Sequence, residues 1–335
     1  MTFNLNAPFD AHLHLRDEEM LKTVAPETAR HFSGAMVMPN LIPPVKTVEG
    51  VIAYRERILA ATGDFIFKPY MTFFITKDHS ISDLEMLKPH ILAAKLYPGG
   101  VTTNSEGGIS SLLDPALTPL FDALADLNIP LSIHGETHDF VMTREEAFAP
   151  IYRQLAVNHP KLKIIMEHIS TAALTYLLDQ FENLFASVTY HHLRFTLDDV
   201  IGGMLNPHLF CKPIIKLPED RKALQNLVFS GHPKVMFGSD SAPHPLSKKL
   251  SPQGAAGIFS APVLLSGLAT LFEENDALDK LPGFLHDHAA RIYDLTLPEK
   301  SLCLEKNPWQ VPRQYGDVVP LHAGEILPWQ VNTIG

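Results

Sequence analysis

The sequence predicts an α/β fold, a (β/α)8 TIM barrel followed by a short irregular C-terminal tail. Short apolar runs alternate with amphipathic stretches, which is typical of repeated β/α units and a parallel sheet. Eight such runs with seven crossovers between them, and a helical segment after the last run, match the count of a closed barrel. A doubly wound open sheet remains an alternative, because the sequence does not give the order of strands in space.

The eight apolar runs are the predicted strands. They cover residues 9–15, 35–38, 67–75, 91–97, 131–134, 163–168, 184–190 and 235–238. The predicted helices between them include residues 47–61, 115–127, 144–158, 171–179 and 219–229.

The end of the chain differs in composition from the rest. No charge occurs between Lys249 and Glu273, but this stretch contains several Gly and Ser together with Pro262, so we expect a buried or half-buried helix and not a membrane span. After about residue 297 the composition shifts to Pro, Gly and Trp. We therefore expect a barrel over residues 1–297 and an irregular extension over 298–335 that packs on it.

Charge and cysteine content exclude several classes of protein. The 27 Lys and Arg against 37 Asp and Glu give a net charge of −10, which argues against binding to nucleic acid or to an acidic membrane. The two cysteines, Cys211 and Cys303, form neither a disulfide framework nor a zinc-binding CxxC motif. The N-terminus has no signal peptide pattern, so we expect a cytoplasmic enzyme with a small-molecule substrate.

His12 and His14 are two residues apart in the first predicted strand, so their side chains lie on the same face. About one His-x-His pair is expected by chance from 17 His in 335 residues, and the chain contains a second, His286 and His288, in a predicted helix. We interpret that second pair as solvated or structural.

Four further residues able to bind a metal or carry a proton lie at the ends of other predicted strands. They are Lys95, His134, His168 and Asp240. In a TIM barrel the carboxyl ends of the strands converge on one site, and imidazole together with carboxylate suits zinc or a similar metal.

Lys95 is the unusual member, because a protonated amine is disfavoured beside a divalent cation. One hypothesis is that burial and a nearby metal lower its pKa, so that the neutral amine adds carbon dioxide to give a carbamate that bridges two cations. The alternative is an ion pair with Asp240 or Glu167, and the sequence pattern favours neither.

Six motifs together resemble the amidohydrolase superfamily and, within it, the class II dihydroorotases. They are His-x-His-x-Arg at 12–16, MPN at 38–40, KLYP at 95–98, IHGE at 133–136, EHIST at 167–171 and GSDSAPH at 238–244. The resemblance implies a binuclear zinc site in a (β/α)8 barrel. It also implies reversible cyclisation of N-carbamoyl-L-aspartate to L-dihydroorotate in pyrimidine biosynthesis.

The resemblance assigns roles residue by residue. His12, His14 and Asp240 correspond to ligands of one metal, His134 and His168 to ligands of the second, and carbamylated Lys95 to the bridge between them. The residues that correspond to substrate contacts are Arg16, Asn40 and His244 for the carboxylate, the backbone of Lys212 and Ala256 for the ring, and Thr102 and Thr103 on a loop. Arg16 is also supported independently, since it shares a face with His12 and its planar guanidinium suits a carboxylate.

The residues 98–108 are rich in Gly and small polar side chains, which predicts a mobile loop that closes over substrate; an ordinary flexible surface loop is the alternative. Two cations lower the pKa of a bound water, and Asp240 is expected to carry the proton in both directions of the reaction. Hydrolysis should then rise as Asp240 loses its proton, and cyclisation should fall.

Three functions remain open from the sequence. They are a dihydroorotase, another cyclic-amide hydrolase such as a hydantoinase or allantoinase, and a noncatalytic paralogue that keeps the barrel. All the expected ligands are present, and Arg16 and Asn40 favour a substrate with a carboxylate. Only eleven residues precede His12, which favours the compact class II type over relatives with an N-terminal β-sandwich. By analogy we expect a homodimer, and we interpret Tyr190, His191 and His192 as packing and rim residues.

Overall fold

Eight parallel strands form a barrel in the computed structural model, which describes residues 1–333. Each strand pairs with the next in the chain, and a bridge between Leu13 and Ser241 joins the last strand region to the first. The strands are β2 (Phe9–Leu13), β3 (Gly34–Val37), β4 (Lys68–Phe74), β5 (Ala93–Leu96), β6 (Leu131–Ile133), β7 (Ile164–Met166), β8 (Leu184–Val188) and β9 (Val235–Phe237). This order confirms the predicted barrel and is not that of a doubly wound sheet, in which the strand order reverses.

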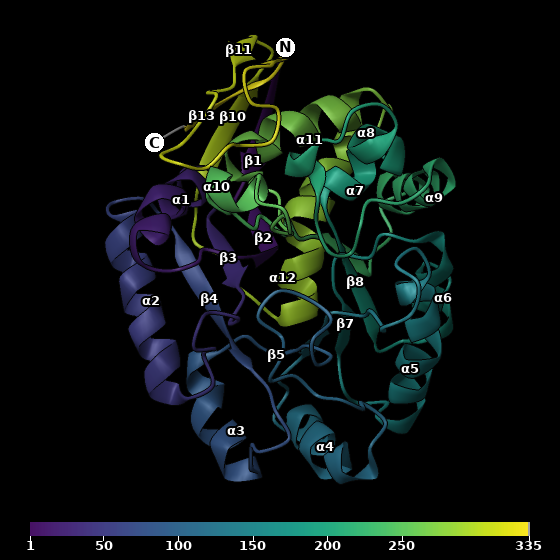
Figure 1. Ribbon diagram of the computed structural model, residues 1–335. Coiled ribbons are helices and arrows are strands. Elements are labelled where there is room, and N and C mark those ends of the chain that lie inside the picture. Colours follow the sequence, from purple (N-terminus) through teal and green to yellow (C-terminus); the bar gives the residue numbers. More distant parts are fainter. Residues whose placement is uncertain (334–335) are drawn as a thin grey trace.

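The helices surround the strands (Figure 1). The five predicted helical regions are helical, and α5 has the predicted bounds. Residues 115–127 and 171–179 are each divided between a short 3-10 turn and an α-helix. The helices are α1 (Glu18–His31), α2 (Val48–Thr62), α3 (Ile81–Leu87), α4 (Thr118–Asp126), α5 (Arg144–Asn158), α6 (Leu177–Gln180), α7 (Tyr190–Arg194), α8 (Leu197–Ile201), α9 (Pro218–Phe229), α10 (Leu246–Lys249), α11 (Leu264–Glu273) and α12 (His288–Tyr293).

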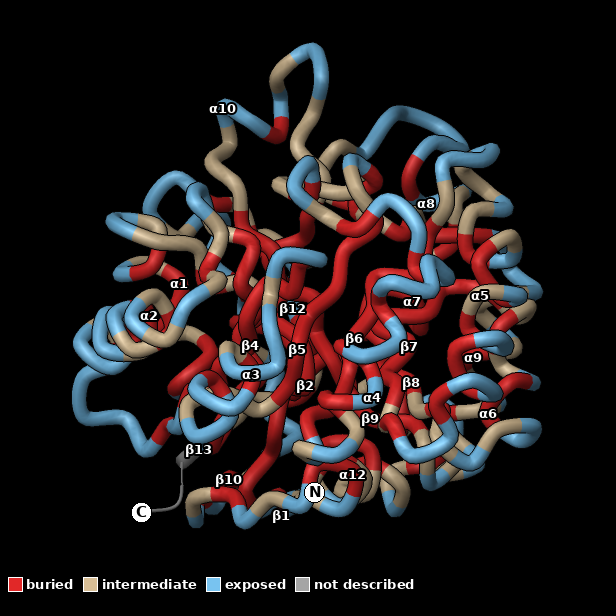
Figure 2. The backbone as a smooth tube through the Cα atoms, turned by 90° about the horizontal axis from the view of Figure 1, so that it is seen from below, coloured by how far each residue is buried: buried red, intermediate tan, exposed pale blue. Residues whose placement is uncertain are grey.

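Alternation along the strands separates the two faces of the barrel wall. Ile164 and Met166 belong to the large apolar cluster that includes the surrounding helices, whereas Ile165 belongs to a smaller cluster that also contains Met36, Met236 and residues of α12. Because strand side chains alternate, Lys95 lies on the same face as Ala93, and Glu167 continues the face of Ile165. The strands at the centre are almost entirely buried (Figure 2). The inner face is therefore apolar near the N-terminal ends of the strands and polar at their C-terminal ends.

The charge-free stretch after Lys249 is only partly helical. Its second half forms the buried helix α11, as expected. Residues 250–260 form a loop that passes beside the C-terminal ends of the barrel strands, where Ala256 and Gly257 line a cavity. Within residues 1–333, no helix has both the length and the apolar character needed to cross a membrane.

The C-terminal extension is more regular than predicted. It contains β10 (Ser301–Glu305), β11 (Trp309–Gln310), β12 (Ile326–Leu327) and β13 (Gln330–Thr333). Strand β10 pairs antiparallel with β13 and with β1 (Thr2–Asn6), so both ends of the chain share one small sheet (Figure 1). The expectation of an irregular tail is wrong here, because β10 pairs with the N-terminal strand β1. The paired residues Asn6 and Ser301 are 295 positions apart in the chain.

Candidate active site

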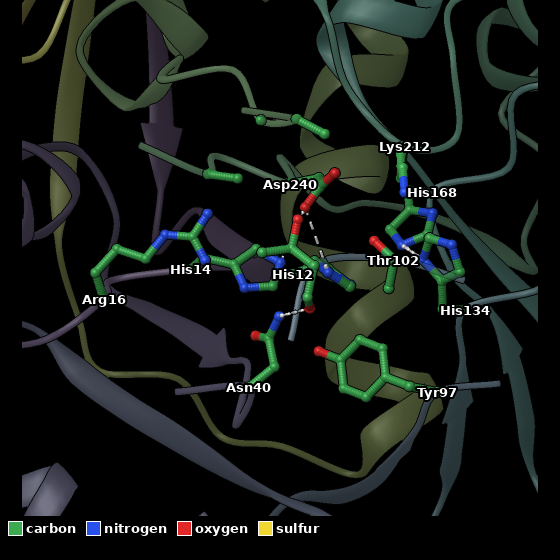
Figure 3. A pocket seen from close by; sticks show the side chains of 14 residues that line it. His12, His14, Arg16, Asn40, Tyr97, Thr102, His134, His168, Lys212 and Asp240 are labelled. Atoms are coloured by element: carbon green, nitrogen blue, oxygen red, sulfur yellow. Dashed lines mark hydrogen bonds and ion pairs between the residues drawn. The ribbon is translucent and has the colours of Figure 1, made fainter. Parts of the chain in front are cut away.

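Closure of the barrel brings the first sequence motif, at residues 12–16, next to the last, at residues 238–244. The backbone of Asp240 donates to the carbonyl of His12 at 2.8 Å, and the backbone of His14 donates to Ser241 at 2.9 Å. These bonds place Asp240 Oδ1 at 3.1 Å from His14 Nε2 and 3.6 Å from His12 Nε2 (Figure 3). The three side chains form a group whose ligand atoms all lie within 4.8 Å of one another, as a metal site requires.

The other two predicted histidine ligands meet beside this group. His134 follows β6 and His168 follows β7, and these strands are neighbours in the barrel. His134 Nδ1 lies 3.3 Å from His168 Nε2, and the ring of His168 lies 4.8 Å from that of His12, centroid to centroid. A tetrahedral zinc with Zn–N bonds of about 2.1 Å separates two ligand nitrogens by about 3.4 Å, so this pair is spaced as two ligands of one ion.

Two buried carboxylates fix which nitrogen of each ring faces the site. Glu167 Oε2 lies 2.8 Å from His12 Nδ1 and also accepts a 2.5 Å hydrogen bond from Ser187. Glu136 Oε2 lies 2.7 Å from His134 Nε2. Each carboxylate favours a proton on the nitrogen that it contacts, which leaves the opposite nitrogen of His12 and of His134 unprotonated toward the site. This arrangement of carboxylate, imidazole and metal is common in metalloenzymes.

Lys95 lies on β5 and is fully buried. Among the described residues its Nζ has no hydrogen-bond partner and no carboxylate oxygen within 4.0 Å, so the expected alternative of an ion pair with Asp240 or Glu167 is wrong. Burial lowers the pKa of Lys95 to about 8, although Glu167 and Asp240 act in the opposite direction. A buried amine without a partner and with a lowered pKa has the chemistry required for carbamate formation.

The charge states of the site also suit a metal. Burial raises the pKa of Asp240, but the hydrogen bond with His14 and the neighbouring imidazoles lower it more, so the pKa lies well below its usual range. Burial lowers the pKa of His14 to about 4. Burial also lowers the pKa of His168 well below its usual value, so at neutral pH the site presents the ionised Asp240 carboxylate and the neutral rings of His14 and His168, which are the forms that bind metals.

Two of the three predicted carboxylate anchors, Arg16 and Asn40, line the same cavity, and the third, His244, does not line it but contacts Arg16. Arg16 donates through Nε to the carbonyl of Pro243 at 3.0 Å, and its Nη2 lies 3.1 Å from His244 Nε2. Tyr54 donates to the carbonyl of Arg16 at 2.7 Å, which fixes the backbone at a residue with a φ of 58°. Burial, followed by the charge of Arg16, lowers the pKa of His244 to about 3, so that ring is neutral beside the guanidinium.

The loop over residues 98–108 covers this cavity. Thr102 and Thr103 line it, as predicted, and Asn40 donates to the carbonyl of Thr103 at 3.1 Å. Lys212 donates from Nζ to the carbonyl of Val101 at 3.0 Å. The loop is therefore folded against the site through two residues that themselves line the cavity, which favours the lid interpretation over an ordinary surface loop.

The cavity as a whole has a volume of about 360 Å³, counting the part open to solvent. Figure 3 shows five of the six predicted metal ligands, His12, His14, His134, His168 and Asp240, together with Arg16 and Asn40; the sixth, Lys95, does not line the cavity. The lining residues are His12, His14, Arg16, Asn40, Tyr97, Thr102, Thr103, His134, His168, Lys212, Asp240, Ala242, Ala256 and Gly257.

The remaining histidines play other parts. His191 and His192 are buried in α7, and their ring nitrogens lie near the thiol of Cys211; we interpret both as packing residues of the barrel end. Tyr190 contacts His322 at 3.0 Å through its hydroxyl. In the second His-x-His pair, His286 and His288 contact backbone carbonyls at 2.8 and 2.6 Å, in accord with a structural role.

Sequence reasoning did not single out Glu136, and it considered Glu167 only as a partner of Lys95. The structure places both against site histidines. For Glu136 the sequence contains a usable signal, since it lies two residues after His134. Glu167 precedes His168 but contacts His12, which is 155 positions away in the chain, so only the barrel brings them together.

Comparisons with known proteins agree with this geometry. The amidohydrolase family profile matches residues 91–295. The chain is 44% identical to the dihydroorotase of Helicobacter hepaticus, over 99% of this chain and 98% of that protein. The crystal structure of dihydroorotase from Campylobacter jejuni superposes with a TM-score of 0.94 at 53% identity, covering 98% of this chain and 97% of that one.

A second solved structure is the dihydroorotase of Saccharomyces cerevisiae in complex with 5-fluoroorotic acid. It superposes with a TM-score of 0.93 at 33% identity, covering 99% of this chain and 98% of that one. Together, the family profile, the full-length identity and the fold show that the chain belongs to the dihydroorotase family of the amidohydrolase superfamily.

Proposed function

We propose that this chain catalyses the reversible cyclisation of N-carbamoyl-L-aspartate to L-dihydroorotate in pyrimidine biosynthesis, as an enzyme of the class II type. One observation carries the proposal: a single small cavity combines four histidines and Asp240, which are five of the six predicted metal ligands, with Arg16 and Asn40. The first set suits the activation of water at a cyclic amide, and the second suits a substrate carboxylate. The names of the full-length relatives support the same activity.

We further propose that the site holds two zinc ions. His12, His14 and Asp240 would hold one, His134 and His168 the other, and Lys95, once carbamylated, would bridge them. The donor set supports this, because His14 and His168 are neutral, Asp240 is ionised, and the buried Lys95 amine has no hydrogen-bond partner among the described residues. When bound, the metals would lower the pKa of water and polarise the ring carbonyl.

The chain's own residues supply the other parts of the reaction. Arg16, Asn40 and His244 bind and orient the substrate carboxylate, and the backbone at Lys212 and Ala256 contacts the ring. In hydrolysis the Asp240 carboxylate takes the proton released by the attacking water and gives it to the departing ring nitrogen. In cyclisation Asp240 takes that proton from the attacking ureido nitrogen and returns it to the oxygen that leaves as water, so one group serves both directions.

The loop that carries Thr102 and Thr103 excludes bulk water while the ring opens or closes. Its contacts with Asn40 and Lys212 link closure of the loop to residues that line the substrate cavity.

Assembly as a homodimer and a cytoplasmic location are also proposed, by analogy with relatives.

A direct assay tests the proposal. Ring opening of L-dihydroorotate is followed by ultraviolet absorbance, with and without a chelator, beside hydantoin and allantoin as alternative substrates. We expect turnover of L-dihydroorotate that the chelator abolishes, and at most slow turnover of the two rings that lack a carboxylate. Preference for hydantoin or allantoin would instead assign a different cyclic-amide hydrolase, and no turnover of any ring by the zinc-loaded protein would support a noncatalytic paralogue.

A further inference from the structure

A buried charged cluster lies outside the candidate metal ligands. The Nζ of Lys216 donates to Glu145 Oε2 and, at 2.7 Å, to the hydroxyl of Ser170. The hydroxyl of Ser170 donates to the same carboxylate oxygen, and the backbone N–H of Ser170 donates to Glu145 Oε1 at 3.0 Å. All three side chains are buried, with Lys216 and Glu145 each at most 2% exposed.

The cluster joins three segments that each carry residues of the site. Glu145 lies in the first turn of α5, the helix that follows His134 and Glu136. Ser170 is two residues after His168. Lys216 follows the segment in which Lys212 lines the cavity. The three segments come from neighbouring β/α units of the barrel (Figure 1).

The backbone of His168 needs such support. Its φ is 39°, in the left-handed region that residues with a side chain rarely occupy. Ser187 accepts from the backbone N–H of His168 at 2.7 Å, and Glu145 accepts from the backbone N–H of Ser170. The backbone N–H of Ile169, between them, donates to the carbonyl of Ser187 at 3.0 Å, so the strained residue and the two residues after it are each fixed by a hydrogen bond.

A purely stabilising role explains this cluster poorly. Burying an ion pair costs about as much desolvation energy as its attraction returns, and apolar replacements of similar volume are often neutral for stability. What apolar residues cannot supply is an acceptor for the N–H of Ser170. The carboxylate of Glu145 supplies that acceptor, and its ion pair with Lys216 offsets the cost of burying it.

We infer that Glu145, neutralised by Lys216, is a positioning residue that holds His168 through Ser170 and so sets the affinity of the metal bound by His134 and His168. The inference rests on the proposed metal site. It predicts an asymmetric defect, because the ligands His12, His14 and Asp240 of the other metal do not contact this cluster among the hydrogen bonds of the described residues.

Two double variants separate positioning from stability. Glu145→Leu with Lys216→Met removes both charges and the acceptor while keeping apolar volume. Glu145→Gln with Lys216→Met also removes both charges but keeps an amide oxygen for the N–H of Ser170. The single variant Lys216→Met is avoided, since it leaves a buried carboxylate unpaired and would destabilise the fold. Lys306→Met, which breaks the exposed pair with Glu273, is the matched control.

The measurement is zinc binding by competition with a chromophoric chelator, in the absence of substrate, together with thermal unfolding. We expect the Leu/Met variant to bind one of two zinc ions about 10-fold to 100-fold less tightly, with the affinity for the other ion unchanged. The Gln/Met variant should recover most of that loss. The inference would be overturned if the variant lost affinity for both zinc ions equally. It would also be overturned if zinc affinity changed with the unfolding temperature and not with the presence of an acceptor at residue 145.

This readout is independent of the reaction. If the wild-type protein binds two zinc ions but does not turn over L-dihydroorotate, the proposed function fails while the positioning role is still tested. If the wild-type protein turns over L-dihydroorotate and the Leu/Met variant keeps both zinc affinities, only the positioning role fails.

Discussion

Glu167 provides the sharpest test of how the site is organised. Its Oε2 contacts His12 Nδ1 at 2.8 Å and accepts from Ser187 at 2.5 Å. Burial raises the pKa of Glu167, but His12 and Lys95 lower it more, so the carboxylate is ionised. Replacement by Gln keeps the shape and removes the charge. The amide then offers one acceptor oxygen to two donors, and its NH2 group faces groups that previously donated.

The magnitude follows from the loss of the charge that orients His12. Removal of a carboxylate behind a metal-binding imidazole typically lowers metal affinity 10-fold to 100-fold. At about 1.4 kcal/mol for each factor of ten, this is about 1.4–2.8 kcal/mol. We expect Glu167→Gln to weaken the zinc ion held by His12 by this amount, because the ring no longer has one preferred tautomer.

The assay is zinc titration against a competing chelator at fixed pH, with thermal unfolding to check the fold. Glu136→Gln should move the loss to the other metal, since Glu136 contacts His134. Glu182→Gln is the control, because that carboxylate is fully exposed. If Glu167→Gln binds both zinc ions as tightly as the unmodified protein, the assignment of tautomers from these contacts is wrong.

Three further predictions concern turnover, the lid and acid stability. Asp240→Ala should lower kcat for L-dihydroorotate by about 10³-fold or more while the protein still folds, and near-normal kcat would reject its role. Replacing Thr102 and Thr103 by Ala should raise KM and lower kcat, each by about 5-fold to 10-fold for one lost hydrogen bond; unchanged steady-state constants would contradict the lid interpretation. Burial lowers the pKa of His31 to about 4 from 6.5, so below pH 6.5 the unfolded chain binds a proton that the folded chain does not. The contribution of His31 to the free energy of unfolding is therefore fully present above pH 6.5, and about 3 kcal/mol of it is lost as the pH decreases toward 4. His31→Gln should flatten that part of a pH series of chemical denaturation, and an unchanged slope would exclude the contribution.

Much of the candidate site was predictable because barrel strands impose simple rules. A spacing of two places His12 and His14 on one face, and a histidine or aspartate after an apolar run lies at the carboxyl end of a strand. The structure brings the four histidines and Asp240 to one cavity, in agreement with these rules, and buries Lys95 in strand β5. Strand ends were less predictable: Tyr190 begins α7 and does not end β8, because Thr189 caps the helix by accepting from the backbone of His192 at 3.0 Å.

Contacts between distant segments were not predictable from local pattern. The pairing of Arg16 with His244 joins residues 228 positions apart, and the contact of Glu167 with His12 spans 155. The tail illustrates the same point, because Pro-rich and Gly-rich composition indicates irregular structure until β1 provides β10 with a partner.

By itself, the sequence determined the type of fold, the kind of chemistry and the residues proposed to carry it, because strand periodicity and side-chain chemistry are local properties. Tertiary structure alone decided which nitrogen of each histidine faces the site, that Lys95 has no carboxylate partner among the described residues, and how the lid and the cluster of Glu145 and Lys216 are anchored. Those features depend on distances between segments far apart in the chain. Closure of the barrel sets these distances.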